Sequence, residues 1–174
     1  MTRYVFIGNS MAAHSAATRI HSLDPRSPIT FVTDEPYPYY SRCALMYYVM
    51  EHCWKRDIFI ADDEHYRRLN AELVFDTVIG VDTSQREVLL LSGQAMGYDK
   101  LCVCTGAAPR RLGVPNEDAE GVQDFIRLED ADSILRESAH AKRAVVIGGG
   151  LIGAEAAEVF HELEAVSKPL RVSF

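Results

Sequence analysis

The chain alternates between short hydrophobic runs and stretches in which small and polar residues recur at helical spacing. Residues 3–8, RYVFIG, form a β-rich run that ends in glycine. The next stretch, SMAAHSAATRIHSL at residues 10–23, places polar residues on one side and small apolar residues on the other, as an amphipathic helix does. Residues 28–35, PITFVTDE, have the pattern of a second buried strand and end in two acids. This order predicts a βαβ unit of a parallel sheet.

The middle of the chain has a different pattern. Residues 71–93, AELVFDTVIGVDTSQREVLLLSG, contain strand-like runs separated by the polar turn DTSQR, which predicts a β-meander. Residues 98–109, YDKLCVCTGAAP, predict a strand that continues into a loop with glycine and proline. A helix is expected to begin within residues 37–50, and another is expected over residues 128–141, whose first turn is acidic as the helix dipole favours.

The opening theme occurs again near the end of the chain. Residues 142–166, KRAVVIGGGLIGAEAAEVFHELEAV, again predict a strand, a glycine turn and a helix. Residues 168–174, KPLRVSF, are expected to begin a further strand. The internal repeat, one unit near Gly8 and one near Gly148, is the strongest organisational feature of the sequence.

The second glycine turn has the spacing G-x-G-x-x-G directly after a strand and at a helix start. Gly148 permits the tight turn, and Gly150 lets the backbone approach a pyrophosphate. Gly153 lets the helix lie close to the strand, while the helix N-terminus supplies N–H groups and the positive end of a dipole. These features predict a dinucleotide site.

The first glycine turn departs from this pattern, because Gly8, Ser10 and Ala13 occupy the three positions. Serine is small enough to allow a close approach of the backbone, and alanine is an accepted variant at the third position. Asp34 or Glu35, at the end of the following strand, falls where a carboxylate accepts the ribose hydroxyls of a dinucleotide. The alternative for these two acids is a solvated strand end.

Composition narrows the classes of function. The chain has 174 residues and a formal net charge of −7, which argues against binding to nucleic acid or to an anionic membrane. No apolar run approaches the roughly 20 residues that span a bilayer, and the N-terminus lacks the pattern of a signal peptide. The cysteine spacing is not that of a zinc site, so no metal is expected, and a cytoplasmic protein with reduced thiols is the expectation. The cysteines are Cys43, Cys53, Cys102 and Cys104.

Four segments together resemble the pyridine nucleotide–disulfide oxidoreductase family: IGNSMAAHSAA, ITFVTDEPYPYYSR, YDKLCVCTGAAPR and VVIGGGLIGAEAAE. The similarity is greatest to the branch that contains NADH–rubredoxin reductases and the large subunit of assimilatory nitrite reductase. It implies an α/β fold with a Rossmann-like FAD-binding domain, made of a parallel sheet and a β-meander, at residues 1–109. A connecting segment at residues 110–141 and the first β-α unit of a Rossmann-like NAD(P)-binding domain at residues 142–174 would follow. The chain thus resembles the N-terminal, truncated part of such a reductase.

The resemblance also implies roles for individual residues. The first turn would bind the pyrophosphate of FAD, Asp34 or Glu35 its adenosine ribose, and the backbone at Val78 and Ile79 its adenine. Glu155, just inside the second helix, resembles the family's acid near the contact of nicotinamide and flavin. The residues implied for FAD are Gly8, Ser10, Ala12, Ala13, Asp34, Glu35, Arg42, Val78, Thr105 and Gly106, and those implied for NAD(P)H are Gly148, Gly150, Ile152 and Gly153.

Two interpretations are open for the cysteines. CALMYY, which begins at Cys43, resembles the phrase C-A-L-P-Y-Y around the redox cysteine of coenzyme A–disulfide reductases and NADH oxidases, whereas the preceding YPYYSR resembles the other branch, in which no thiol acts. A helix N-terminus beside Arg42 would favour a thiolate, yet the longer match favours an inert Cys43.

Cys102 and Cys104 lie two apart on one predicted strand and face the same side, which favours a buried pair over a redox dithiol.

The function implied by the resemblance is hydride transfer from NAD(P)H to FAD, with electrons passed to a small molecule or a small redox protein. A second hypothesis is a non-catalytic dinucleotide-fold subunit or scaffold, completed by another chain, and Ser10 in place of a glycine favours it. A third is a thiol–disulfide reductase or NADH oxidase that uses Cys43.

Overall fold

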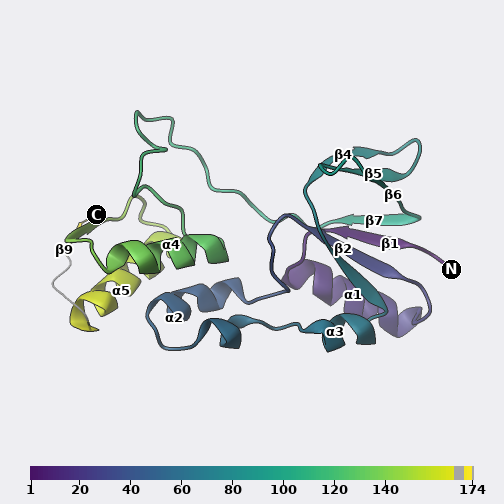
Figure 1. Ribbon diagram of the computed structural model, residues 1–174, viewed down its shortest axis with the longest axis horizontal. Helices are drawn as coiled ribbons and strands as arrows, with labels where there is room; N and C mark the ends of the chain where they lie inside the picture. Colours follow the sequence, from purple (N-terminus) through teal and green to yellow (C-terminus); the bar gives the residue numbers. More distant parts are fainter. Residues whose placement is uncertain (167–170, 174) are drawn as a thin grey trace. The chain divides into compact units, whose positions relative to one another are not determined.

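The computed structural model describes residues 1–166 and 171–173, which form two compact units. The first unit comprises residues 1–41 and 59–107, and the second comprises residues 42–58 and the described residues from 108 onward. Each unit contains one of the two strand–glycine turn–helix repeats (Figure 1). The domain boundaries implied by the resemblance fall after residues 109 and 141. In the structure residues 42–58 group with the second unit.

The first unit is built on a parallel sheet with the strand order β3-β2-β1-β7. Helix α1 connects β1 to β2, so the predicted βαβ unit is present (Figure 1). The elements are β1 (Tyr4–Ile7), α1 (Met11–Leu23), β2 (Ile29–Thr33), α3 (Asp63–Arg68), β3 (Ala71–Phe75) and β7 (Lys100–Val103).

Alternation along β1 separates the two faces of the sheet. Phe6 points to the face covered by α1, where it packs with Phe31 and with the small residues Ala13 and Ala17 of the helix. Val5 and Ile7 point to the opposite face, where the cluster includes Val32, Val88, Leu90 and Tyr98. Because both faces of the parallel sheet are covered, the sequences of its central strands are nearly continuous hydrophobic runs.

The opposite face is covered by the predicted β-meander, an antiparallel sheet of β4 (Val78–Asp82), β5 (Glu87–Leu90) and β6 (Ala95–Gly97). Its polar turn is closed by Asp82, whose Oδ1 accepts hydrogen bonds from Ser84 N, Ser84 Oγ and Gln85 N. These bonds lower the pKa of the Asp82 carboxyl. The meander therefore supports the first sheet from the side away from α1.

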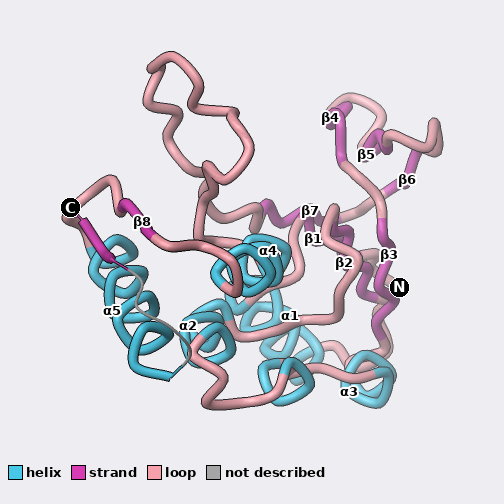
Figure 2. Tube along the Cα trace, turned by 60° about the vertical axis from the view of Figure 1, so that its left-hand side comes forward, coloured by secondary structure: helices cyan, strands magenta, loops and turns pink. Residues whose placement is uncertain are grey.

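The second unit contains the helices α2, α4 and α5 and the parallel strand pair β8–β9 (Figure 2). Residues 128–138 form the expected helix α4, which begins where the Asp130 carboxylate accepts hydrogen bonds from the backbone N–H groups of Ile126 and Arg127. Of the strand expected in residues 168–174, residues 168–170 and 174 lie outside the described residues. The elements are η1 (Arg42–Ala44), α2 (Leu45–Val49), η2 (Lys55–Ile58), α4 (Leu128–Ser138), β8 (Arg143–Val145), α5 (Leu151–Val166) and β9 (Arg171–Ser173).

Candidate functional site

The first glycine turn lies at the carboxyl end of β1, between the ends of β2 and β7. Gly8 N donates to Val32 O at 2.8 Å, and Cys104 N donates to Ile7 O at 2.7 Å. Gly8 has φ +116°, and a Cβ there would lie 2.2 Å from Cys104 O. Only glycine fits both the backbone conformation and the close approach of β7. The turn is thus fixed at the strand ends, where open α/β sheets bind ligands.

Helix α1 begins immediately after this turn. Its N-cap, Ser10, has the extended backbone angles φ −135° and ψ −171°, which any residue adopts without strain. Among the described residues Ser10 makes no side-chain capping bond, so its hydroxyl does not compete for the N–H groups of the first turn. Ala12 is exposed, whereas Ala13 is fully buried in the core. The third position of the motif therefore serves helix–sheet packing.

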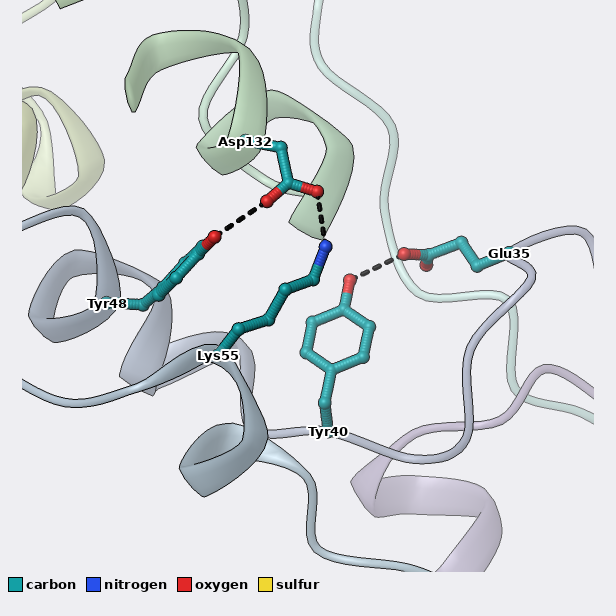
Figure 3. Close-up of polar contacts among 5 residues, drawn as sticks. All are labelled: Glu35, Tyr40, Tyr48, Lys55 and Asp132. Carbon is teal, nitrogen blue, oxygen red and sulfur yellow. Dashed lines mark hydrogen bonds and ion pairs between the residues drawn. The ribbon is translucent and has the colours of Figure 1, made fainter. Parts of the chain in front are cut away.

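The two acids after β2 have different surroundings. Asp34 is exposed, while Glu35 is buried and accepts a hydrogen bond of 2.5 Å from the Tyr40 hydroxyl group (Figure 3). Glu35 N also donates to Thr33 Oγ1. Both acids follow the carboxyl end of β2, next to the turn at Gly8 in the same sheet.

The loop after β7 lies on the other side of the first turn. Thr105 and Gly106 are exposed, and Gly106 has φ +71°, a left-handed conformation that suits glycine. In the meander, Val78 is half-buried and packs against the core, whereas Ile79 is exposed. The implied FAD residues other than Arg42 thus belong to the first unit.

Cys102 and Cys104 lie side by side and pack against the α1 core, with 3.5 Å between their Sγ atoms. Burial and the neighbouring Cys102 raise the pKa of the Cys104 thiol to about 11. A protonated thiol is a poor nucleophile, which favours a packing role for this pair.

The second glycine turn has the stereochemistry that the motif requires. Gly148 has φ +118°, and a Cβ at Gly153 would lie 1.9 Å from Gly148 O. At Gly150 a Cβ would meet no atom of the described residues within 4 Å. The backbone at Gly150 is therefore open to a ligand, while Gly153 is required for the contact of α5 with the turn. Ile152 is exposed and Glu155 is half-buried on the first turns of α5.

Arg42 and Cys43 belong to the second unit. The Arg42 guanidinium donates to Ile126 O at 2.8 Å, and Cys43 is exposed in the short helix η1. The helix expected in residues 37–50 is an α-helix only over Leu45–Val49. Such a short helix provides little of the dipole that would favour a thiolate at Cys43.

Sequence reasoning missed two groups of polar side chains. Asp132 on α4 accepts from Tyr48 Oη at 2.8 Å and pairs with Lys55 Nζ at 2.6 Å, so one carboxylate connects three segments of the second unit (Figure 3). In the first unit a network centres on His14 and Asn9. Its only sequence signal is an asparagine inside the glycine turn and a histidine among small helix residues.

The groups of three or more His, Cys, Asp or Glu that a metal ion needs do not occur among the described residues. The described residues also contain no helix both long and apolar enough to span a bilayer.

A parallel sheet with a glycine turn at its carboxyl edge, and a second strand–glycine turn–helix repeat later in the chain, are the architecture of dinucleotide-binding α/β proteins. The chain belongs to the pyridine nucleotide-disulphide oxidoreductase family, whose model matches residues 2–171. The predicted family and fold class are thereby confirmed.

The chain is similar to the nitrite reductase (NAD(P)H) of Bacillus subtilis (strain 168), with 37% identity over 155 residues, covering 88% of this chain and 19% of that protein. It is 33% identical over 157 residues to the assimilatory nitrate reductase electron transfer subunit of the same organism, covering 89% of this chain and 20% of that one. The chain thus spans about a fifth of the length of these curated relatives.

Among solved structures, an NAD-dependent persulfide reductase from A. fulgidus superposes with a TM-score of 0.87 at 30% identity, covering 98% of this chain and 33% of that one. The ferredoxin reductase for the CYP199A2 system from Rhodopseudomonas palustris gives a TM-score of 0.87 at 26% identity, covering 99% of this chain and 42% of that one.

Proposed function

We propose that the chain is the part of a flavin-dependent NAD(P)H oxidoreductase that provides binding sites for FAD and for NAD(P)H. The observation that carries this proposal is that both glycine turns combine a positive φ at the first glycine with a helix start directly after the turn. When both cofactors are bound, NAD(P)H supplies a hydride that FAD accepts and passes on as electrons. The protein binds and orients the two cofactors.

The residues of the first unit fit FAD. The turn at Gly8 and the first N–H groups of α1 offer donors to the pyrophosphate. Asp34 and Glu35 follow β2 and offer acceptors to the adenosine ribose, and Thr105 and Gly106 follow β7 on the opposite side. These segments lie at the carboxyl ends of three adjacent parallel strands, β2-β1-β7. Val78 and Ile79 are proposed to contact the adenine.

The second unit fits NAD(P)H. The open backbone at Gly150 admits a pyrophosphate, and the exposed Ile152 lies on the first turn of α5. Glu155, one turn further along, is proposed to lie near the nicotinamide. Arg42 is proposed to lie near the flavin or its phosphates. We also propose that residues 1–109 form the FAD-binding domain, residues 110–141 a connecting segment, and residues 142–174 the start of the NAD(P)-binding domain.

The proposed electron acceptor is a small molecule or a small redox protein. Support comes from the relatives, which include a nitrite reductase and a ferredoxin reductase. A cytoplasmic location with reduced thiols is part of the proposal, supported by four free cysteines.

The scaffold alternative rests on Ser10 in place of glycine. The extended backbone of Ser10 needs no glycine, so this substitution does not argue against FAD. A thiol-based reaction at Cys43 remains a second candidate because the side chain is exposed.

Cofactor retention tests the proposal directly. The purified chain is incubated with FAD and desalted, and the flavin that remains is measured by absorbance; NADH and NADPH binding are measured by calorimetric titration. We expect FAD to be retained and a nicotinamide dinucleotide to bind. Gly150→Glu, which places a carboxylate at the open backbone, should abolish NAD(P)H binding and leave FAD retention unchanged. A chain that retains no FAD would refute the proposal.

A further inference from the structure

Asn9 lies between Gly8 and Ser10 in the first glycine turn, and its side chain makes three hydrogen bonds. Asn9 Nδ2 donates to Tyr37 O at 3.3 Å. Asn9 Oδ1 accepts from Tyr66 Oη at 3.0 Å and lies 2.8 Å from His14 Nε2. The amide therefore ties the turn to the segment after β2 and to α3.

The donors and acceptors in this network have one consistent arrangement. A carbonyl oxygen such as Tyr37 O only accepts, so the amide nitrogen of Asn9 must face it and Oδ1 must face His14. His14 Nε2 then carries the ring proton, and His14 Nδ1 is an acceptor. His65 Nε2, 3.0 Å from His14 Nδ1, must be the donor.

The His14 ring is held firmly in place. It stacks between Phe31 and Tyr39, with ring centroids 4.5 and 4.4 Å away and interplanar angles of 8° and 16°. Its exposed fraction is 4%. Burial and the nearby His65 lower the pKa of His14 to about 4, so at neutral pH the ring is uncharged and retains the single donor that Asn9 needs.

The two segments joined by Asn9 are the ones that would hold two adjacent groups of one ligand, the pyrophosphate and the adenosine ribose. The turn at Gly8 to Ser10 faces the proposed pyrophosphate site, and Tyr37 follows Asp34 and Glu35, the proposed ribose acceptors. A change in the Asn9 amide would therefore alter the spacing between the two binding segments, without contact between His14 and the cofactor.

We propose that His14 is a positioning residue for FAD, which donates from Nε2 to Asn9 and so holds the pyrophosphate turn and the ribose-binding segment in register. This inference rests on the proposed function of the first unit.

The test compares two substitutions that separate packing from hydrogen bonding. His14→Phe keeps the stacked ring and removes both ring nitrogens. His14→Gln loses the ring but ends in an NH₂ group that can donate to Asn9 Oδ1. The dissociation constant of FAD is measured for the full 174-residue chain by quenching of flavin fluorescence, with melting temperatures recorded in parallel. His21→Phe, on the same helix, is the matched control.

We expect His14→Phe to weaken FAD binding roughly tenfold, the effect of losing one buried hydrogen bond, and His14→Gln to bind FAD more tightly than His14→Phe. If His14 acted only through packing, His14→Phe would bind FAD more tightly than His14→Gln, and this result would overturn the inference. His21→Phe should bind FAD like the wild type.

Two further measurements keep the inference testable if a His14 variant fails to fold. Tyr66→Phe removes the other donor to Asn9 Oδ1 and should also weaken FAD binding, and unchanged binding would count against the inference. Nitrogen NMR of the wild type should show the proton of His14 on Nε2, and a proton on Nδ1 would overturn it. A wild-type chain without FAD affinity would refute the proposed function as well. If the wild type binds FAD but His14→Phe binds it more tightly than His14→Gln, only the role of His14 is refuted.

Discussion

The Tyr40 hydroxyl group donates a hydrogen bond of 2.5 Å to the Glu35 carboxylate, and both side chains are almost fully buried, with exposed fractions of 5% and 6% (Figure 3). Hydrogen bonds to a buried charged group are among the stronger ones in proteins. This contact fixes the segment after β2, and it distinguishes Glu35 from the exposed Asp34 beside it.

Tyr40→Phe should therefore destabilise the first unit. The variant removes a hydrogen bond between two buried side chains, and we expect the free energy of unfolding to fall by about 1–3 kcal/mol. Urea denaturation followed by circular dichroism measures this change. Tyr47→Phe is the matched control, because Tyr47 is 50% exposed and should change the free energy of unfolding by less than about 0.5 kcal/mol. Equal effects of the two variants would contradict the prediction.

The buried His14 predicts a loss of stability in mild acid. The pKa of His14 is lowered from 6.5 to about 4 in the folded chain. Between these values the unfolded chain binds more protons than the folded chain, so the free energy of unfolding falls as the pH decreases from about 6.5 to about 4. The full effect is on the order of 3 kcal/mol.

His14→Phe removes this titration, so its stability should depend less on pH over the same range. Hydrogen bonds from the backbone N–H groups of His65 and Arg3 are the chief cause of the lowered pKa values of Asp62 and Asp99, whose ordinary value is 3.8. These two carboxyl groups therefore lose their contribution to folding stability only at lower pH. Denaturation curves at several pH values separate the two ranges. A wild type as stable at pH 4.5 as at pH 7, with ~2 kcal/mol expected between them, would show that His14 is not buried as a neutral ring.

Local patterns predict the parts of the fold in which neighbours in sequence act together. Gly8 and Gly148 are identifiable because a tight turn with positive φ requires glycine, and the strands because both faces of the sheet are apolar. The DTSQR turn is recognisable because Asp82 bonds to residues two and three positions further along.

Contacts between distant segments are not predictable in the same way. His14 meets His65 across 51 residues, and Arg42 meets Ile126 across 84 residues. Nothing in the hydrophobic pattern of residues 42–58 indicates that they group with the second unit. Such contacts depend on the arrangement of whole elements, which local periodicity does not encode.

The second glycine turn predicts opposite results for two alanine substitutions. Gly153→Ala would place a Cβ 1.9 Å from Gly148 O, so the helix must shift and the melting temperature should fall, at a cost of about 1–3 kcal/mol. Gly150→Ala meets open space within the described residues, so the fold should persist while NAD(P)H binding weakens because the methyl group obstructs the pyrophosphate. Calorimetric titration and thermal unfolding measure the two effects. The prediction fails if Gly153→Ala melts at the wild-type temperature.

Cys43 is predicted to be dispensable for electron transfer. It is exposed on a three-residue helix, and the α-helix that follows has only five residues. Cys43→Ser in the complete reductase should leave NAD(P)H-driven reduction of an artificial dye within a few-fold of the wild type, as should the control Cys53→Ser. Activity toward a disulfide substrate that disappears only in Cys43→Ser would assign the protein to the thiol-dependent branch.

The 174-residue chain alone is not expected to catalyse hydride transfer from NAD(P)H to FAD. Hydride transfer requires the reacting atoms of nicotinamide and flavin to lie roughly 3–3.5 Å apart, a geometry that small displacements abolish. In the described part of the second unit the parallel sheet has two strands, β8 and β9, and a sheet of this size is at best marginally stable without further packing. Val145, Ile147 and Leu151, which surround the second glycine turn, are 68%, 71% and 77% exposed.

A nicotinamide site with so little support should bind weakly and hold its ligand loosely. We therefore expect the isolated chain, loaded with FAD, to show no rapid flavin reduction when it is mixed with NADH in a stopped-flow instrument. A complete reductase of the same family, loaded with FAD in the same way, serves as the positive control. The first unit should still retain FAD, because its sheet is covered by α1 on one face and by the meander on the other. Flavin bleaching in the isolated chain at about 1 per second or faster, an ordinary enzymatic rate, would show that the second unit already holds the nicotinamide in a reactive position.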